Sequence, residues 1–132
     1  MTNLATNPEF STVLVVKKKW GGERVSVNTS SGNYCGKVLF YDKAGAKSSF
    51  HFHPLHKDET FTCVKGSFYF RYLDGETGQK QQRVLKVNDV VRLRRGIPHQ
   101  LEALEDNSEI FEVSTYDDPS DIIRIEPGDN QK

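Results

Sequence analysis

The residues whose types and spacing suit chemistry lie in one segment, GAKSSFHFHPLHKDETFTCVKG, which holds three histidines and a glutamate. Side chains two positions apart in a β-strand point to the same face, so His51 and His53 are expected to project together. Two imidazoles on one face can bind a single ion. The spacing therefore indicates a metal site.

Glu59 opens a second apolar run, in which Glu59, Phe61 and Cys63 are expected to share a face. A returning strand would bring Glu59 beside the two histidines. Pro54 lacks an amide donor and favours a turn before that strand, and Gly66 suits its end. Glu59 is thus a third candidate ligand.

His99 is the fourth candidate ligand, because it follows a glycine turn at the end of a further strand-like stretch. Three neutral imidazoles and one carboxylate suit a divalent transition metal such as Mn, Fe, Zn, Ni, Co or Cu. Four protein ligands would also leave positions for water or a substrate, which is what metal-assisted catalysis requires.

The histidine-rich segment resembles the first motif of the cupins, a family of small β-barrels, at Gly45, His51, His53, Glu59 and Gly66. That motif runs glycine, five residues, His-x-His, three or four residues, Glu, six residues, glycine. Here five residues separate His53 from Glu59. A bulge or a longer turn would absorb the excess. His56, which lies in this longer stretch, is the alternative ligand to His53 or Glu59.

A second cupin motif is matched less fully. Gly96 and His99 stand in its register, and Asn88 occupies the first glycine position, where asparagine is tolerated because it visits left-handed backbone conformations. Arg94 replaces the proline of the motif and Ala103 replaces its asparagine. The resemblance therefore supports His99 as a ligand more than it supports the surrounding residues.

The resemblance implies an all-β fold: one cupin barrel (double-stranded β-helix, or jelly roll) over residues 1–132, with its core at about 12–125 and polar tails. It is similar to small cupins of sugar and sugar-phosphate metabolism. It implies a metal-dependent isomerase or epimerase acting on a small sugar or sugar phosphate. An iron-dependent dioxygenase and a non-catalytic sugar-binding module are the alternatives, because cupins host all three. Small cupins commonly pair, so a homodimer is also expected.

Candidate catalytic residues lie near the C-terminal end of the strand pattern. Glu112 and Tyr116 are expected on one face of a strand over 110–116. If that face lines the barrel, either residue would move a proton close to the metal, and Glu59 itself is a further candidate. The alternative is that Glu112 is the buried partner of an arginine.

The charge of the chain limits its partners. Its 18 basic and 18 acidic side chains give a formal net charge of zero. This balance argues against a general attraction to nucleic acid or to an anionic membrane, so anion recognition must come from local groups. Arg92 and Arg94 share a face and are candidates to bind a substrate phosphate or carboxylate. The alternative for both is a solvated or dimer-facing strand edge.

Short strand candidates separated by turn residues follow one another along the chain, which favours a sandwich or barrel with almost no helix. GlyGly at 21 and 22 is expected to be one of the turns. Besides the metal-bearing pair, strands are expected at 12–17, 25–27, 34–41, 66–73, 82–87, 90–94, 98–104, 110–116 and 122–125.

The two cysteines, Cys35 and Cys63, lie in expected strands without a CxxC spacing, so both are expected to be reduced core residues. The chain has no apolar stretch long enough to span a bilayer and no charged-then-apolar leader. A cytoplasmic protein that binds a small molecule is therefore expected.

Overall fold

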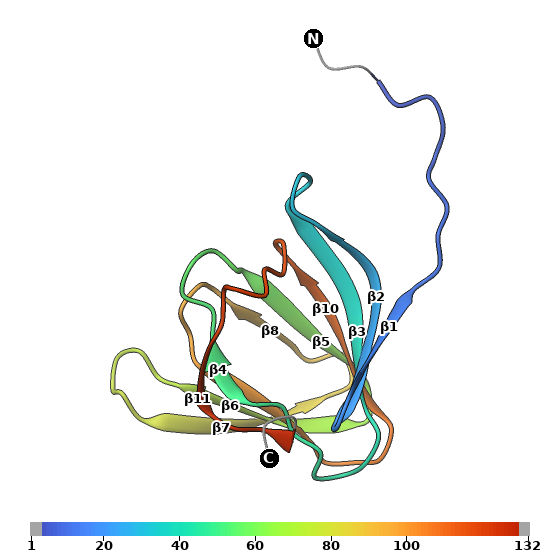
Figure 1. The fold of residues 1–132 in the computed structure, drawn as a ribbon. Coiled ribbons are helices and arrows are strands. Elements are labelled where there is room, and N and C mark those ends of the chain that lie inside the picture. The colour runs from blue at the N-terminus through green and yellow to red at the C-terminus, as the bar shows by residue number, and fades with distance from the viewer. Residues whose placement is uncertain (1–3, 130–132) are drawn as a thin grey trace.

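The computed structural model describes residues 4–129, and in that range the chain forms strands and no α-helix. The order of the strands along the chain can be followed by colour in Figure 1. They are β1 (Leu14–Lys18), β2 (Gly21–Thr29), β3 (Tyr34–Tyr41), β4 (Phe50–Phe52), β5 (Glu59–Lys65), β6 (Ser67–Leu73), β7 (Lys80–Lys86), β8 (Val90–Leu93), β9 (His99–Ala103), β10 (Ser108–Ser114) and β11 (Ile123–Glu126).

The strands form two antiparallel sheets that face each other, as in a cupin jelly roll (Figure 1). One sheet has the order β1-β2-β3-β10-β5-β8 and the other has the order β11-β4-β9-β6-β7. Alternation decides which side chains face inward: along β3 and β5, buried positions recur at every second residue. These two sheets confirm the all-β fold that the resemblance to the cupins implied.

The core between the sheets is rich in aromatic side chains. Trp20 stacks on Tyr41 with ring centroids 4.4 Å apart, and Tyr41 meets Phe68 edge-on at 5.1 Å. Phe68 and Phe70 are both buried, which confirms that part of the aromatic run on β6 packs in the core. Both cysteines are unpaired and buried, as expected.

The turn expected at GlyGly is wrong, because Gly21 and Gly22 are the first two residues of β2. Gly21 pairs with Tyr41 on β3. A Cβ atom on Gly21 would lie 1.9 Å from the carbonyl oxygen of Phe40. The glycine is therefore needed for the close approach of two strands and not for a turn.

Two further outcomes concern the ends of the predicted elements. Asn88 has a φ of 77°, which confirms the left-handed conformation expected at the glycine position of the second motif. The strand expected over 110–116 is β10, Ser108–Ser114, and it ends before Tyr116.

Within residues 4–129 no helix is long and apolar enough to cross a membrane.

Candidate metal centre

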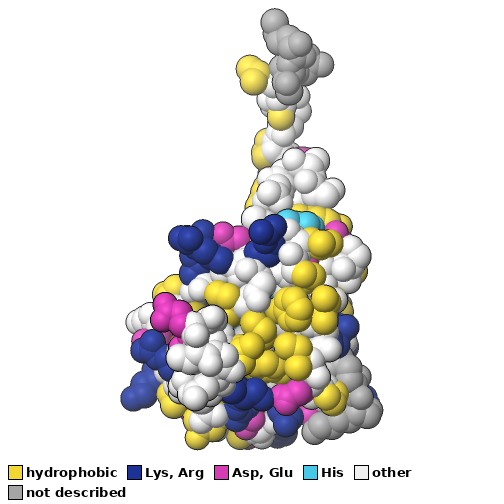
Figure 2. All heavy atoms as spheres, turned by 90° about the vertical axis from the view of Figure 1, so that its left-hand side faces the viewer, with side chains coloured by type: hydrophobic (Ala, Val, Ile, Leu, Met, Phe, Trp, Pro, Cys, Tyr) yellow, Lys and Arg dark blue, Asp and Glu magenta, His cyan; other side chains and the backbone are white. Residues whose placement is uncertain are grey.

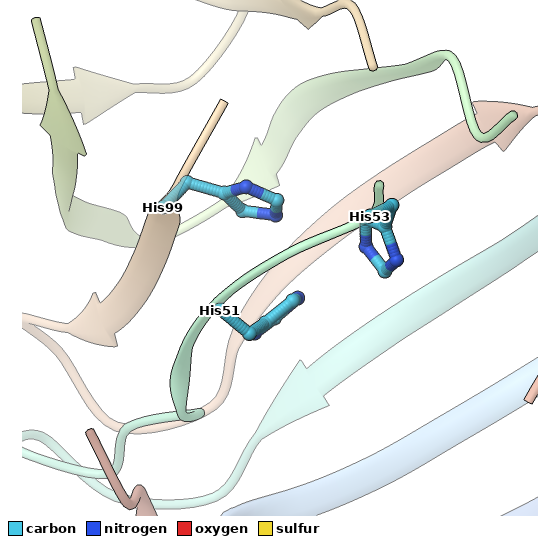
Figure 3. Close-up of side chains that lie close together, drawn as sticks. All are labelled: His51, His53 and His99. Atoms are coloured by element: carbon cyan, nitrogen blue, oxygen red, sulfur yellow. The ribbon is translucent and has the colours of Figure 1, made fainter. Parts of the chain in front are cut away.

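Three histidines come together on the inner face of the second sheet. His51 is the central residue of β4, His53 follows the end of this strand, and His99 begins β9. His51 and His99 are direct partners in the pairing of β4 with β9. One ring nitrogen from each of the three lies within 4.8 Å of the other two, and Figure 3 shows the rings gathered around a common space.

The backbone fixes the orientation of each imidazole. Nδ1 of His51, His53 and His99 lies 2.9, 2.6 and 2.8 Å from the carbonyl oxygens of Ser49, Asp121 and Ile97, respectively. A carbonyl oxygen only accepts, so each Nδ1 carries the proton and each Nε2 keeps a free lone pair. Metal-bound histidines are held in this way.

Two of these Nε2 atoms need a partner. Nε2 of His53 and Nε2 of His99 are buried, and neither has a hydrogen-bond partner among the described residues. An unsatisfied buried nitrogen costs free energy, which a coordinated cation would offset. The residues therefore fit a divalent metal ion, which is the binding that their spacing predicted.

Glu59, the remaining candidate donor, approaches the histidines from the opposite sheet. It begins β5, and its Oε2 lies 3.2 Å from Nε2 of His53 and 3.3 Å from Nε2 of His99. Because β4 and β5 belong to different sheets, Glu59 meets the histidines across the barrel interior and not across a hairpin. The expected proximity is present, but the expected route through a returning neighbour strand is wrong.

Burial and neighbouring charges act differently on the ionisation of each candidate ligand. Burial, together with the neighbouring His99 and His53, lowers the pKa of His51 to about 3, so this imidazole is neutral at neutral pH. Burial also opposes the charged form of His53 and of Glu59. For His53 the carboxylate of Glu59 outweighs burial and raises the pKa. The pKa of Glu59 is held well below its ordinary value by His99 and Lys57.

The long stretch between His53 and Glu59 is organised by Asp121. The buried carboxylate of Asp121 accepts backbone N–H groups from Leu55, His56 and Lys57, at 2.6, 3.1 and 3.0 Å. The same residue offers its carbonyl oxygen to His53. The excess length is thus a loop wrapped around one carboxylate, and Asp121 ties this loop to the candidate ligand His53.

His56 does not join the three-histidine cluster. Its side chain is 43% exposed, and its Nε2 lies 3.5 Å from the carboxylate of Asp118. Among the described residues, the cluster therefore contains His53 and not His56.

A buried network of opposite charges adjoins the histidines. Lys57 is buried, with its Nζ 3.4 Å from Glu59, 3.1 Å from Glu112 and 3.2 Å from Asp117. Lys37 is also buried and contacts Asp117 at 2.8 Å and Glu23 at 3.1 Å. Burial alone would lower the pKa of both lysines, but these carboxylates raise it, so both lysines stay charged.

The centre opens into a cavity of about 320 Å³ that runs between the two sheets. Besides the four candidate ligands, its walls include apolar residues such as Trp20 and Tyr41 and the charged residues Lys57 and Glu112. Glu112 was expected either to line the barrel interior or to pair with a buried arginine. It lies on the cavity wall, and its ionic partner is Lys57 and not an arginine. Tyr116 is not among the residues that line this cavity.

Arg92 and Arg94 also lie outside the cavity. Arg92 is on β8, where its guanidinium makes two contacts with Asp58, at 3.1 and 2.7 Å. It borders a second hollow, between the edge strands β7 and β8, with Tyr72, Val84 and Val90. Figure 2 views this side of the molecule and shows hydrophobic side chains gathered near its centre.

Lys57, Tyr41 and Asp121 were not singled out from the sequence. Lys57 lies two positions before Glu59, so strand alternation was a signal that both face the same way. Tyr41 continues the buried alternation of β3. Asp121 carries no local signal, because its partners lie more than sixty residues earlier in the chain.

Two facing antiparallel sheets with histidines from one sheet and a carboxylate from the other define a β-barrel protein with an internal metal centre. The Cupin domain family matches residues 38–113, and the chain belongs to this family. The matched range includes the four candidate ligands.

Solved structures support the same fold. The capsular polysaccharide assembling protein CapF from Staphylococcus aureus is 20% identical with a TM-score of 0.72, and the alignment covers 89% of this chain and 33% of that one. Oxalate decarboxylase from Bacillus subtilis is 22% identical with a TM-score of 0.74, covering 94% of this chain and 33% of that one. The chain thus spans about a third of the length of these neighbours. No curated protein matches it by sequence.

Proposed function

We propose that this cupin is a metal-dependent isomerase or epimerase acting on a small sugar or sugar phosphate. One observation above all supports this function, the convergence of three backbone-oriented histidines and Glu59 on the wall of a cavity. The name of one structural neighbour, a capsular polysaccharide assembling protein, is in keeping with a sugar substrate.

The proposed ligands are His51, His53, His99 and Glu59. When bound, a divalent ion would act as a Lewis acid on a carbonyl or hydroxyl oxygen of the substrate. The neutral imidazoles add no charge, so a divalent ion would keep one net positive charge after Glu59 is counted. This charge favours the developing negative charge of an enolate-like transition state.

Glu112 is the proposed base. Its Oε2 accepts a hydrogen bond from Ser114 Oγ at 3.0 Å and forms an ion pair with Lys57 Nζ at 3.1 Å, so the carboxylate is held in place on the cavity wall. It would remove a proton from the carbon next to the substrate carbonyl and return it on the other side or to the neighbouring carbon. The buried hydroxyl of Tyr41, which has no hydrogen-bond partner among the described residues, faces the same cavity and would donate to a substrate oxygen.

Solvent exchange tests the proposal. Protein loaded with manganese is incubated with a panel of small aldoses, ketoses and their phosphates in deuterated water, and the carbon-bound protons are followed by NMR. Loss of a proton signal next to the carbonyl is expected, and Glu112→Gln should slow it by about two to four orders of magnitude. Glu102→Gln, on the other face of the second sheet, is the matched control.

Oxygen uptake is recorded in the same samples with manganese and with iron. Oxygen consumption without proton exchange would contradict the isomerase and favour a dioxygenase. Saturable stabilisation of the protein by a sugar, with neither reaction, would contradict the isomerase and favour a non-catalytic binding module.

We also propose that the chain forms a homodimer through β1. This strand is an unpaired sheet edge, and Leu14 and Val15 on it are exposed. The segment before β1 extends away from the barrel in Figure 1 and exposes Phe10 almost fully. A second copy of the chain would pair with this edge and cover these apolar side chains.

A further inference from the structure

The charged groups of the cavity are nearly all paired with one another. Five carboxylates line it, and each contacts a basic side chain: Glu23, Glu59, Glu112 and Asp117 contact lysines, and Asp118 contacts His56. Four lysine and arginine side chains also line it. Of these, Lys37 and Lys57 are the partners of the carboxylates.

The other two cations have no ion pair or side-chain hydrogen bond among residues 4–129. They are Lys18, at the end of β1, and Arg124, on β11. Lys18 is half-buried and Arg124 is exposed. They come from different sheets, and both line the cavity.

Strand register places Arg124 next to the metal centre. Arg124 on β11 is the direct partner of His51 on β4, and His51 is in turn the direct partner of His99 on β9. Direct partners in adjacent antiparallel strands project to the same face with Cβ atoms about 4.5–5.5 Å apart. One row across the sheet therefore carries the guanidinium and two candidate ligands into the same cavity.

We propose that Arg124, assisted by Lys18, is an oxyanion subsite that holds a carboxylate or phosphate group of the substrate while another oxygen of the substrate meets the metal centre. This inference rests on the proposed function for its metal centre. A guanidinium without a partner presents a planar fork of donors that matches either oxyanion. The substrate class is thereby narrowed to small anions, such as sugar acids or sugar phosphates.

The charge of the cavity agrees with this assignment. The four cations and five carboxylates that line it give a formal charge of −1, which a bound divalent ion would change to +1. The metal-loaded cavity would therefore attract an anion more strongly than a neutral ligand of the same shape. Arg92, by contrast, is already engaged by Asp58 outside the cavity.

Calorimetric titration of the manganese-loaded protein tests the subsite with three probes: glycolate, its uncharged analogue glycolamide, and inorganic phosphate. The variants are Arg124→Gln, Arg124→Lys and Arg94→Gln. Arg94 is an exposed arginine outside the cavity, so Arg94→Gln makes the same chemical change away from the proposed subsite. Circular dichroism verifies that every variant is folded.

Arg124→Gln is expected to weaken the binding of glycolate, phosphate or both by about tenfold or more, since a charge-assisted hydrogen-bonded pair is lost. Arg124→Lys should recover part of the loss, and glycolamide binding should not change. The anion that loses more affinity identifies the substrate group. Binding by Arg124→Gln within twofold of wild type, or an equal loss in Arg94→Gln, would overturn the assignment.

The failure of the metal centre can be distinguished from the failure of the subsite. Elemental mass spectrometry of wild type reports on the metal centre alone. If no metal is retained, the phosphate titration is repeated on metal-free wild type and Arg124→Gln. A difference between these two proteins would support the oxyanion subsite without the metal, and equal binding would overturn it.

Discussion

His51 lies directly opposite His99 across the antiparallel pair of β4 and β9, with ring centroids 4.6 Å apart. Strand register thus brings together two ligands that are far apart in the chain. A slip of one residue would turn His51 to the other face of the sheet, so the metal centre depends on a single register.

Removing both imidazoles should abolish metal binding. We expect His51→Ala combined with His99→Ala to retain no stoichiometric metal, because two donors remain and a transition ion requires more. The barrel should stay folded, since its apolar core does not include these side chains. Elemental mass spectrometry of protein purified without chelator measures the metal.

His56→Ala is the matched control for that experiment. His56 lies in the loop between His53 and Glu59 but outside the cluster, so this variant should keep the metal content of wild type. Stoichiometric metal in the double variant, or its loss in His56→Ala, would show that the ligands are assigned wrongly.

Asp121→Ala should loosen the loop between His53 and Glu59. Three backbone N–H groups would lose their acceptor, and we expect about 2–4 kcal/mol less free energy of unfolding, measured in urea. Metal affinity should also fall, by about tenfold, because Asp121 positions His53. Asp106→Ala is the control, since its exposed carboxylate accepts one N–H from Ala44 and should cost less than about 1 kcal/mol. Equal losses in the two variants would contradict the role of Asp121.

The candidate site was partly predictable because its signals are local. Alternation placed His51 and His53 on one face, and the glycine turn before His99 marked a second strand entering the cavity. The three histidines that converge could therefore be named from short segments.

What could not be predicted depends on contacts between distant strands. Glu59 was expected beside the histidines but not from the opposite sheet, and Arg124 stands beside His51 only because β11 pairs with β4. The pattern of β11 shows four exposed residues and no alternation that would mark an inward side chain. Arg92 and Arg94 had the better local pattern, yet they lie outside the cavity.

Gly66→Ala and Gly45→Ala should differ in cost although both glycines have left-handed φ angles, of 70° and 89°. A Cβ on Gly66 would lie 2.1 Å from Oγ of the buried Ser108, whereas a Cβ on Gly45 would meet nothing within 4 Å. We expect Gly45→Ala to lose about 1 kcal/mol from backbone strain, and Gly66→Ala to lose about 2–4 kcal/mol from strain and overpacking together. Urea unfolding compares the variants. Equal losses would mean that the contact with Ser108 relaxes freely.

The proposed dimer should be sensitive to charge on β1. Light scattering of wild type is expected to give twice the chain mass of 15.0 kDa, and Leu14→Arg should give the monomer. Val84→Arg places the same charge on β7, at the edge of the other sheet, and should leave the dimer intact. Dissociation by Val84→Arg alone would instead place the interface at the hollow between β7 and β8.

Asp117→Asn should lower stability at neutral pH but not in acid. Burial opposes ionisation of Asp117, but Lys57 and Lys37 outweigh it and lower its pKa to about 2. A carboxyl group with a depressed pKa in the folded state contributes stability above its unfolded pKa of about 4 and loses it as the pH falls towards the folded value. We expect the variant to be about 1–2 kcal/mol less stable than wild type between pH 5 and 7, a value reduced for the partial exposure of this side chain.

The difference between the two proteins should then shrink as the pH falls from about 4 to about 2, which urea unfolding at several pH values measures. Glu76→Gln, in the exposed turn between β6 and β7, is the control and should match wild type at every pH within about 0.5 kcal/mol. A difference that stayed constant into acid would show that Asp117 acts through its shape and not its charge. Lys37 and Lys57 would then be balanced by Glu23, Glu59 and Glu112 alone.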